Sequence, residues 1–165
     1  MQDDIRIRPA VIDDAETIHA ALRAMAEGMK AGPKFVSTVE DIGHYGFGAV
    51  PAFEVLIAET DGAAFAGLCL TFPSFSTWMG TPGIYVQDLF VADAFRGRRI
   101  GERLLHAVAR RGREKGARYM RLSVDVENPR AQAFYDRIGI RHSRDELIHM
   151  IKGADFDAFA GEDKT

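Results

Sequence analysis

The first fifty residues combine one short strand pattern with two helix patterns. Ile5 and Ile7 alternate with arginines, which predicts an edge strand that the following proline stops. Apolar residues then recur at the spacing of one helix face, at Ile18, Leu22, Met25 and Met29. Ser37 and Glu40 match a capping box and predict a second, short helix. The glycines within residues 41–51 predict a loop after it.

The middle of the chain has the pattern of consecutive strands. Residues 53–59 and 64–72 are rich in apolar residues and flank Asp61-Gly62, a strong hairpin signal. Serine, threonine, glycine and proline over residues 73–83 predict a turn. Residues 84–91 then predict a third strand.

The remaining pattern alternates between helix and strand. Helical spacing returns at Ile100, Leu104 and Val108. Residues 119–126 alternate as in a strand, and Asn128, followed by a proline, is typical of a helix N-cap. A last strand is predicted within residues 146–151, before a polar tail, residues 153–165. This order of elements predicts an α/β fold built on a mixed sheet.

Composition narrows the class of protein. With 165 residues the chain predicts a single domain over residues 1–165, with a core of about 5–152. The net charge of -3 gives no general reason to expect a nucleic-acid partner. The sequence has no run of about 18 apolar residues, so we expect no membrane-spanning segment. Its N-terminal residues are too polar and acidic for a signal peptide. Because Cys69 is the only cysteine, we expect no internal disulfide and a reducing cytoplasm. The histidines form no metal-binding motif, so we expect no metal.

The first stretch with candidate chemistry is a loop that carries arginines and glycines immediately before a helix. Helix-start N–H groups lack partners within the helix, and the helix dipole adds positive charge. Gly97 and Gly101 let the backbone approach a ligand, and Arg96, Arg98 and Arg99 add charge. A pyrophosphate fits such a site. The alternative interpretation is an ordinary turn with solvated arginines.

The second stretch, residues 127–140, opens a later helix. Asn128 serves as an N-cap under either a structural or a functional interpretation. Phe134 has the character of a core residue. The hydroxyl of Tyr135 needs a partner if it is buried and could donate a proton to a leaving group.

Together the two stretches resemble the GNAT superfamily of acetyltransferases. Residues 96–101, Arg-Gly-Arg-Arg-Ile-Gly, resemble the Q/R-x-x-G-x-G/A loop that grips the pyrophosphate of acetyl-CoA, with Arg99 at the middle glycine. Residues 128–139 resemble the late motif whose Asn, Phe and Tyr line the CoA arm. The resemblance implies a largely antiparallel GNAT-type sheet flanked by helices. It also implies that CoA lies in a wedge between strands 84–91 and 119–126.

Residues 72–91 are similar to the matching segment of the diamine acetyltransferases, the group of spermidine/spermine and thialysine N-acetyltransferases. That group carries an STW-type turn and a YLEDLFV-type strand. Here Gln87 replaces the glutamate and Asp88 retains the aspartate. The resemblance implies acetyl transfer to the primary amine of a small molecule, and a homodimer.

The resemblance also implies roles for individual residues. Tyr135 is expected to be the general acid, and Asp88 to hold the amine or pass on its proton. The residues expected to contact acetyl-CoA are Leu89, Phe90, Val91, Arg96, Gly97, Arg98, Arg99, Ile100, Gly101, Asn128, Ala131 and Phe134. The acceptor is expected to meet Gln87, Asp88, Glu27 and Trp78. The alternatives left open are an acyl-CoA sensor without turnover, a peptide or protein N-acetyltransferase, and a nucleic-acid module that uses the basic loop.

Overall fold

The computed structural model describes residues 4–161 of the chain. These residues belong to two compact units, Met1–Ser123 and Val124–Thr165. The first unit contains all the strands that the structure describes, and the second contains two helices. A single N-acetyltransferase domain over residues 1–165 stays a prediction.

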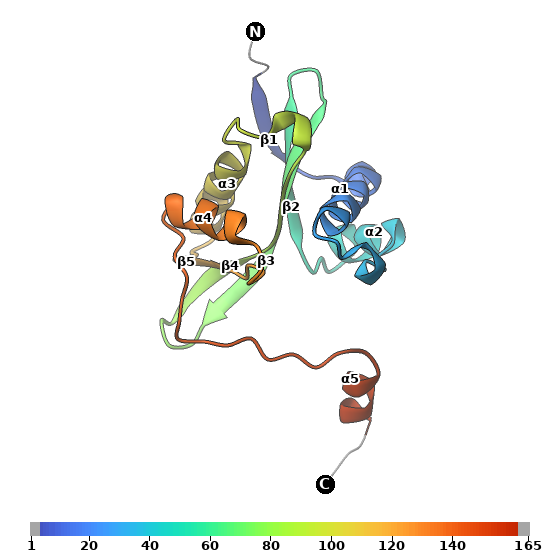
Figure 1. Ribbon diagram of the computed structural model, residues 1–165, viewed down its shortest axis with the longest axis vertical. Coiled ribbons are helices and arrows are strands. Elements are labelled where there is room, and N and C mark those ends of the chain that lie inside the picture. Colours follow the sequence, from blue (N-terminus) through green and yellow to red (C-terminus); the bar gives the residue numbers. More distant parts are fainter. Residues whose placement is uncertain (1–3, 162–165) are drawn as a thin grey trace. The chain divides into compact units, whose positions relative to one another are not determined.

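A sheet of five strands organises the first unit (Figure 1). In sheet order, which is also chain order, the strands within residues 4–161 are β1 (Ile5–Pro9), β2 (Glu54–Thr60), β3 (Phe65–Ser76), β4 (Thr81–Val91) and β5 (Tyr119–Leu122). Neighbouring strands are antiparallel, except that β4 and β5 run parallel. The predicted fold class, an α/β protein with a mixed and largely antiparallel sheet, is confirmed.

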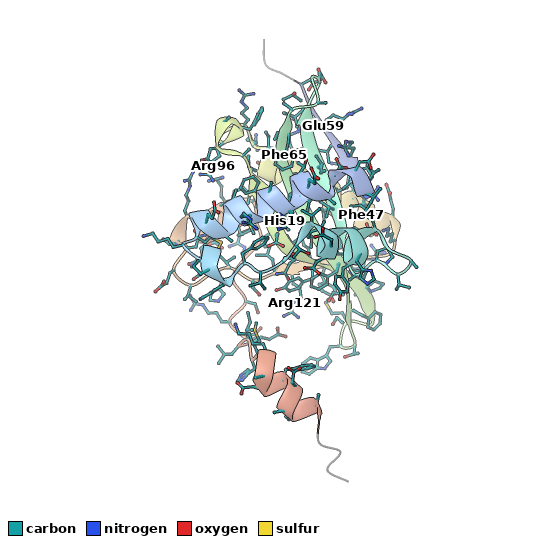
Figure 2. All side chains as sticks on the ribbon, turned by 90° about the vertical axis from the view of Figure 1, so that its right-hand side faces the viewer. His19, Phe47, Glu59, Phe65, Arg96 and Arg121 are labelled. Atoms are coloured by element: carbon teal, nitrogen blue, oxygen red, sulfur yellow. The ribbon has the colours of Figure 1, made fainter. Side chains whose placement is uncertain are left out.

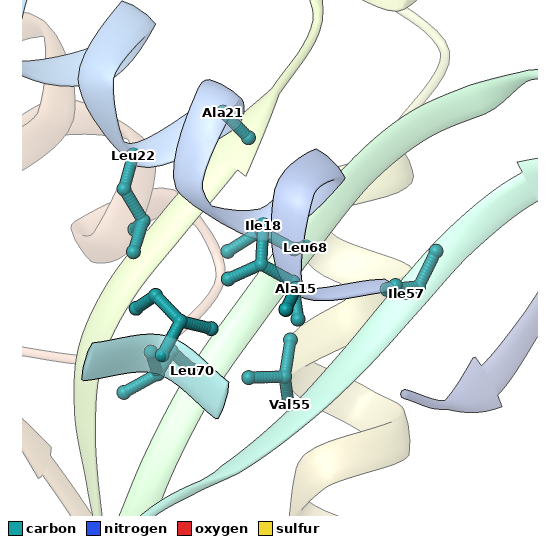
Figure 3. Packing of buried hydrophobic residues seen from close by; sticks show 9 residues of the cluster. Ala15, Ile18, Ala21, Leu22, Val55, Ile57, Leu68 and Leu70 are labelled. Atoms are coloured by element: carbon teal, nitrogen blue, oxygen red, sulfur yellow. The ribbon is translucent and has the colours of Figure 1, made fainter. Parts of the chain in front are cut away.

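Two helices, α1 (Ala15–Gly28) and α2 (Val39–Phe47), cover one face of this sheet (Figure 1). Figure 3 shows the core between the helices and the sheet. Its buried members are Ala15, Ile18, Ala21, Leu22, Ile42, Val55, Ile57, Leu68 and Leu70. Burying each larger side chain contributes roughly 1.5–3 kcal/mol to stability. This core fixes the position of α1 over β3 and β4.

The opposite face of the sheet carries α3 (Ile100–Glu114) (Figure 1). Its buried residues are Ile100, Gly101, Leu104, Leu105, Ala107 and Val108. Arg103 also donates a hydrogen bond to the carbonyl oxygen of Ile5 at 2.6 Å, which ties the start of α3 to β1. Within residues 4–123, the first unit also contains three short 3-10 helices: η1 (Ile12–Asp14), η2 (Gly32–Lys34) and η3 (Asp93–Phe95).

A buried carboxylate anchors the edge strand β1. Glu59 on β2 is 4% exposed and accepts hydrogen bonds from Arg6 and Arg8. Arg8 also donates two hydrogen bonds to Asp14, at 2.8 and 2.9 Å. The arginines lower the pKa of both carboxyl groups, which keeps them ionised at neutral pH. Figure 2 labels Glu59 near this edge of the molecule.

The structure corrects three predicted boundaries in this unit. The capping box of α2 is Thr38 and Asp41, one residue after the predicted pair. The predicted loop over residues 41–51 is wrong in its first half, because α2 extends to Phe47. Gly46 permits close packing against the ring of Phe53, so this glycine serves a helix contact instead of a loop. The predicted turn over residues 73–83 is also shorter, because β3 and β4 pair as far as Ser76 and Thr81.

The second unit contains α4 (Pro129–Arg137) and α5 (Gly153–Ala160). The predicted strand within residues 146–151 is wrong, because a strand needs a paired neighbour and this segment has none within the described residues. The strand predicted over residues 119–126 ends at Leu122 for the same reason. Residues Gly153–Ala160 of the expected tail form α5, and residues 162–165 lie outside the described part of the chain. Within residues 4–161, no helix is long and apolar enough to cross a membrane.

Candidate active site

Strand β4 contains a β-bulge at its centre. Val86 pairs with Thr71 of β3, and Asp88 pairs with Leu70, so the intervening Gln87 has no partner on β3. Bulges bend a strand and re-aim the side chains beside them, and they occur often next to active sites. Gln87 is exposed and Asp88 is partly buried.

Beyond this bulge β4 leaves its other neighbour. The parallel pairing with β5 runs from Gly83 and Tyr119 to Val86 and Leu122, and stops there. The remaining residues of β4, up to Val91, pair only with β3 among the strands described. One edge of the segment 87–91 therefore offers backbone N–H and C=O groups to a ligand. Leu89, Phe90 and Val91, predicted to contact acetyl-CoA, lie on this segment.

Asp88 lies on the sheet face that α1 and α2 cover. Its cross-strand partner Leu70 belongs to the core shared with α1, and residues opposite each other in an antiparallel pair share a face. Burial raises the pKa of Asp88 to about 6. A carboxyl group with this pKa is ionised at neutral pH and is a stronger base than an exposed aspartate.

The neighbouring Cys69 is a poor nucleophile. It is fully buried, and burial together with the charge of Asp88 raises the pKa of its thiol to about 12. A thiol with this pKa stays protonated at neutral pH. Cys69 is therefore a core residue of β3.

Two aromatic residues beside Asp88 are members of the site that the sequence did not indicate. Phe72 and Tyr85 pair across β3 and β4 and stack with ring centroids 4.8 Å apart. The Tyr85 hydroxyl lies 2.8 Å from Oγ of Ser123, just beyond the end of β5. The alternation in Ile84–Val86 could have shown that Tyr85 faces away from α3, but not that it joins β5 where the wedge opens.

The arginine and glycine loop joins the end of β4 to α3. Gly97 has φ 79°, and Arg99, the N-cap of α3, has φ 57°. Both values lie in the left-handed region that glycine adopts at least cost. A glycine is favoured at the position of Arg99 for this reason. The backbone of the loop therefore follows a glycine-type path despite the arginine side chain.

The arginines of this loop have partners within the protein. Arg96 forms an ion pair with Asp93 at 2.8 Å, and the guanidinium of Arg98 lies 5.3 Å from the Phe95 ring centroid. Arg99 binds Glu102 through two hydrogen bonds of 2.9 and 3.0 Å. Figure 2 labels Arg96 at the edge of the molecule. The backbone N–H groups at the start of α3, at Ile100 and Gly101, are the remaining groups of the loop that the prediction assigns to the phosphates.

The other predicted residues of the CoA site lie together in α4 of the second unit. The side chain of Asn128 caps the helix by accepting a hydrogen bond from the backbone N–H of Ala131 at 3.0 Å, which confirms the predicted N-cap. The rings of Phe134 and Tyr135 meet edge-on with centroids 5.0 Å apart. Both side chains are partly buried. The roles of these four residues stay predictions.

Two predicted acceptor residues are on the surface. Glu27 is exposed at the end of α1, and Trp78 is fully exposed in the turn between β3 and β4. Cavities of about 340 and 250 Å³ share Glu54, Leu56, Pro73 and Arg111, and Phe72 also lines the smaller one. None of the predicted site residues lines either cavity. The described residues contain no cluster of histidine, cysteine and carboxylate side chains able to hold a metal ion.

Known proteins share this architecture. Solved structures with the same fold include a Vibrio cholerae integron cassette protein (TM-score 0.80, 20% identity, covering 96% of this chain and 98% of that one). Another is the aminoglycoside N-acetyltransferase AAC(6')-Iy in complex with CoA (TM-score 0.72, 20% identity, 92% and 97%).

Relatives identified by sequence narrow the family to which the chain is similar. The thialysine N-epsilon-acetyltransferase of Bos taurus is 32% identical over 142 residues, covering 82% of this chain and 83% of the relative. The similarity to the diamine acetyltransferase group is thereby confirmed. The model of the Acetyltransferase (GNAT) family matches residues 21–140. With its wedge beside β4 and its helix-start loop, the chain belongs to the GNAT acetyltransferase family.

Proposed function

We propose that this enzyme transfers the acetyl group of acetyl-CoA to the primary amine of a small aliphatic acceptor by direct attack on the thioester. The observation that carries the proposal is the partly buried Asp88, with a pKa of about 6, beside the unpaired edge of β4. Membership of the GNAT family supplies the reaction class. Relatives named for acetylation of thialysine and ornithine support a small amine acceptor.

The donor binds along two elements that meet at the end of β4. Pantetheine pairs with the backbone of Leu89, Phe90 and Val91, because this edge has no partner strand among the described residues. The pyrophosphate lies at the start of α3, against the backbone of residues 96–101. Asn128, Ala131 and Phe134 border the CoA arm.

The acceptor must lose a proton before it attacks. A lysine-like ammonium has a pKa of about 10.4, so the free amine is rare at neutral pH. Asp88 accepts this proton directly or through water, and its raised pKa reduces the energetic cost of the transfer. Gln87, Glu27 and Trp78 border the acceptor.

Acetyl transfer then proceeds without a covalent enzyme intermediate. The amine nitrogen attacks the carbonyl carbon, and a backbone N–H near Phe90 stabilises the charge that develops on the oxygen. The C–S bond breaks as the C–N bond is completed. Tyr135 gives its proton to the departing thiolate, so that CoA leaves as a thiol. No metal ion enters this sequence.

Further features of the protein bear on its oligomeric state, its cellular compartment and its binding partners. Homodimer formation is supported by exposed apolar residues at the β3–β4 hairpin, where Phe75 near the end of β3 and Trp78 and Met79 in the turn are 61%, 100% and 57% exposed. The lone buried Cys69 is compatible with a reducing cytoplasm. We expect neither nucleic acid nor membrane as a partner, because the net charge is -3 and the loop arginines have partners within the protein.

A binding experiment combined with a rate experiment tests the function. Saturating acetyl-CoA at about 100 times its Kd should stabilise the fold by roughly 2.7 kcal/mol, whereas NAD should have no effect. Asp88→Asn should keep this stabilisation and lose about 100-fold or more in thiol release with lysine or a short diamine. Stabilisation without thiol release from any amine or peptide indicates a sensor. Release with peptides alone indicates a protein-modifying enzyme.

A further inference from the structure

Two hydrogen bonds between a tyrosine and a serine bracket the short parallel pair of β4 and β5. These strands lie side by side (Figure 1) and pair over residues 83–86 of β4 and the whole of β5. Beside the first pair, the Tyr119 hydroxyl lies 2.8 Å from Oγ of Ser74 on β3. Beyond the last pair, the Tyr85 hydroxyl lies 2.8 Å from Oγ of Ser123.

The two bonds differ in where they lie in the sheet. The Tyr119 ring crosses β4 at Gly83, where the side chain of any other residue would clash with it. Ser74, Gly83 and Tyr119 are paired across three neighbouring strands, so this bond lies where the sheet is closed. The bond between Tyr85 and Ser123 lies at the opposite end, where the backbone pairing of β4 and β5 has stopped.

Tyr85 therefore joins the two strands at the point where they separate. Its partner in the parallel register is Arg121, and Ser123 follows two residues later, a rise of about 6.6 Å at about 3.3 Å per residue. Side chains of a strand lean along the strand direction, which lets a tyrosine cover this distance. We call the pair of Tyr85 and Ser123 the apex of the wedge. It extends the junction of the strands beyond their last backbone pair.

The apex lies on the same face of the sheet as Asp88. Tyr85 pairs with Phe72, and Asp88 pairs with Leu70, two residues away on β3. Residues i and i+2 of a strand share a face, so Tyr85 and Asp88 lie on one face despite the bulge between them. The Tyr85 ring is also stacked on Phe72. Its position is thus fixed from β3 by the stacking and from the end of β5 by the hydrogen bond.

The width of the wedge at the apex matters for acetyl transfer. The thioester carbon has to meet the amine within bonding reach of Asp88, and a misplacement of about 1 Å can cost about 100-fold in rate. The pyrophosphate of the donor is assigned to the start of α3, at the other end of the molecule of acetyl-CoA. The placement of the acetyl end therefore depends on the strands near the apex.

On the basis of the function proposed above, we propose that Tyr85 is a positioning residue, whose hydrogen bond to Ser123 fixes the width of the wedge and so places the thioester beside Asp88. Tyr85 acts through the backbone of residues 87–91, which follow it on β4 and form the unpaired edge. It exchanges no proton with the substrates. Its contribution is made in the rate of the chemical step, because the phosphates of the donor bind elsewhere.

Removing either hydroxyl tests this role. Tyr85→Phe keeps the ring and its stacking on Phe72, and Ser123→Ala removes the other partner. With lysine as the acceptor, each variant should lower kcat by about 10-fold, whereas the Kd of acetyl-CoA by calorimetry should change by less than about 3-fold. The double variant should be no slower than either single variant, because both remove the same bond. Ser123→Thr keeps the hydroxyl and should keep kcat near that of the wild type.

The other tyrosine and serine supply the matched control. Tyr119→Phe and Ser74→Ala remove a hydrogen bond of the same kind and length at the closed end of the strand pair. They should lower the unfolding temperature as much as Tyr85→Phe does, by about 2–4 °C. They should leave kcat unchanged. A role in stability alone would affect both pairs equally.

Each outcome bears on one of the two proposals. An unchanged kcat in Tyr85→Phe, an equal loss of kcat in Tyr119→Phe, or additive losses in the double variant overturn the positioning role. If Tyr85→Phe does not fold, the comparison of Ser123→Ala with Ser123→Thr decides, and equal kcat values for these two overturn the role as well. Thiol release by the wild type with no amine, although acetyl-CoA binds, overturns the proposed function itself.

Discussion

Arg99 holds a left-handed backbone conformation, φ 57°, while its side chain donates two hydrogen bonds to the carboxylate of Glu102. The backbone follows the path for which the family motif uses glycine, and the side chain is occupied within its own helix. The Glu102 carboxylate raises the pKa of Arg99, so the guanidinium is charged at all practical pH values. The backbone of Arg99 is thus strained, and its guanidinium forms an ion pair with the neighbouring Glu102 carboxylate.

Substituting Arg99 separates these two effects. We expect Arg99→Gly to be more stable than Arg99→Ala by about 0.5–1 kcal/mol, because only alanine keeps the strain of positive φ, and because glycine is also preferred to alanine at an N-cap. Arg99→Gly should also bind acetyl-CoA at least as tightly as the wild type. Thermal unfolding and calorimetric titration measure the two effects. A less stable glycine variant would show that the left-handed conformation carries no cost.

The pKa of Asp88 predicts a change in the pH dependence of activity. A raised pKa of about 6 means that the carboxylate, the form that accepts a proton, is lost as the pH falls through this value. We expect log kcat/KM to gain one additional unit of slope below about pH 6 in the wild type. Asp88→Asn should be much slower and should lack this additional slope. A wild-type profile without a break between pH 5 and 7 would remove Asp88 from the role of base.

Gln87 is exposed in the bulge beside Asp88, where the diamine acetyltransferases carry a glutamate. Gln87→Glu restores a negative charge of nearly the same shape. We expect it to raise kcat/KM for spermine by about 10- to 100-fold relative to lysine, the effect of one charge-assisted contact. Rates on spermine, putrescine, thialysine and lysine measure the change. Unchanged relative rates would place polyamine recognition at another residue.

Tyr135 tests acid catalysis separately from packing. Tyr135→Phe removes the proton and keeps the ring, which contacts Phe134. Turnover should fall by about 10- to 1,000-fold, with little change in the affinity for acetyl-CoA. If turnover persists while the unfolding temperature falls, Tyr135 is a packing residue.

Local signals in the sequence were sufficient for most of the fold. The alternation around Ile5, the hairpin signal at Asp61 and the cap at Asn128 each specify an element through neighbours along the chain. Residues 146–151 show the limit of such signals, because a strand also needs a partner, and local alternation does not supply one. At α2, helix packing outweighed the glycines that predicted a loop.

Some residues of the candidate site could likewise be identified from local sequence signals, and others could not. Asp88 and the helix-start loop were identified from motifs, because each depends on residues close together in the sequence. Tyr85 was missed for a physical reason. Its alternation with Ile84 and Val86 gives its face on β4, but its place beside β5 depends on the register of two strands that α3 separates in the chain. That register is a property of the folded sheet.

The most direct test of this account is the stoichiometry of acetyl transfer. Purified protein is incubated with acetyl-CoA and lysine, and free thiol is measured together with the acetylated amine by mass spectrometry. The account predicts one N-acetylated acceptor for each CoA thiol released, with the acetyl group on the side-chain nitrogen and at least 100-fold less of both products with Asp88→Asn. Binding of acetyl-CoA without any acetylated amine, from lysine or from a diamine, would contradict it.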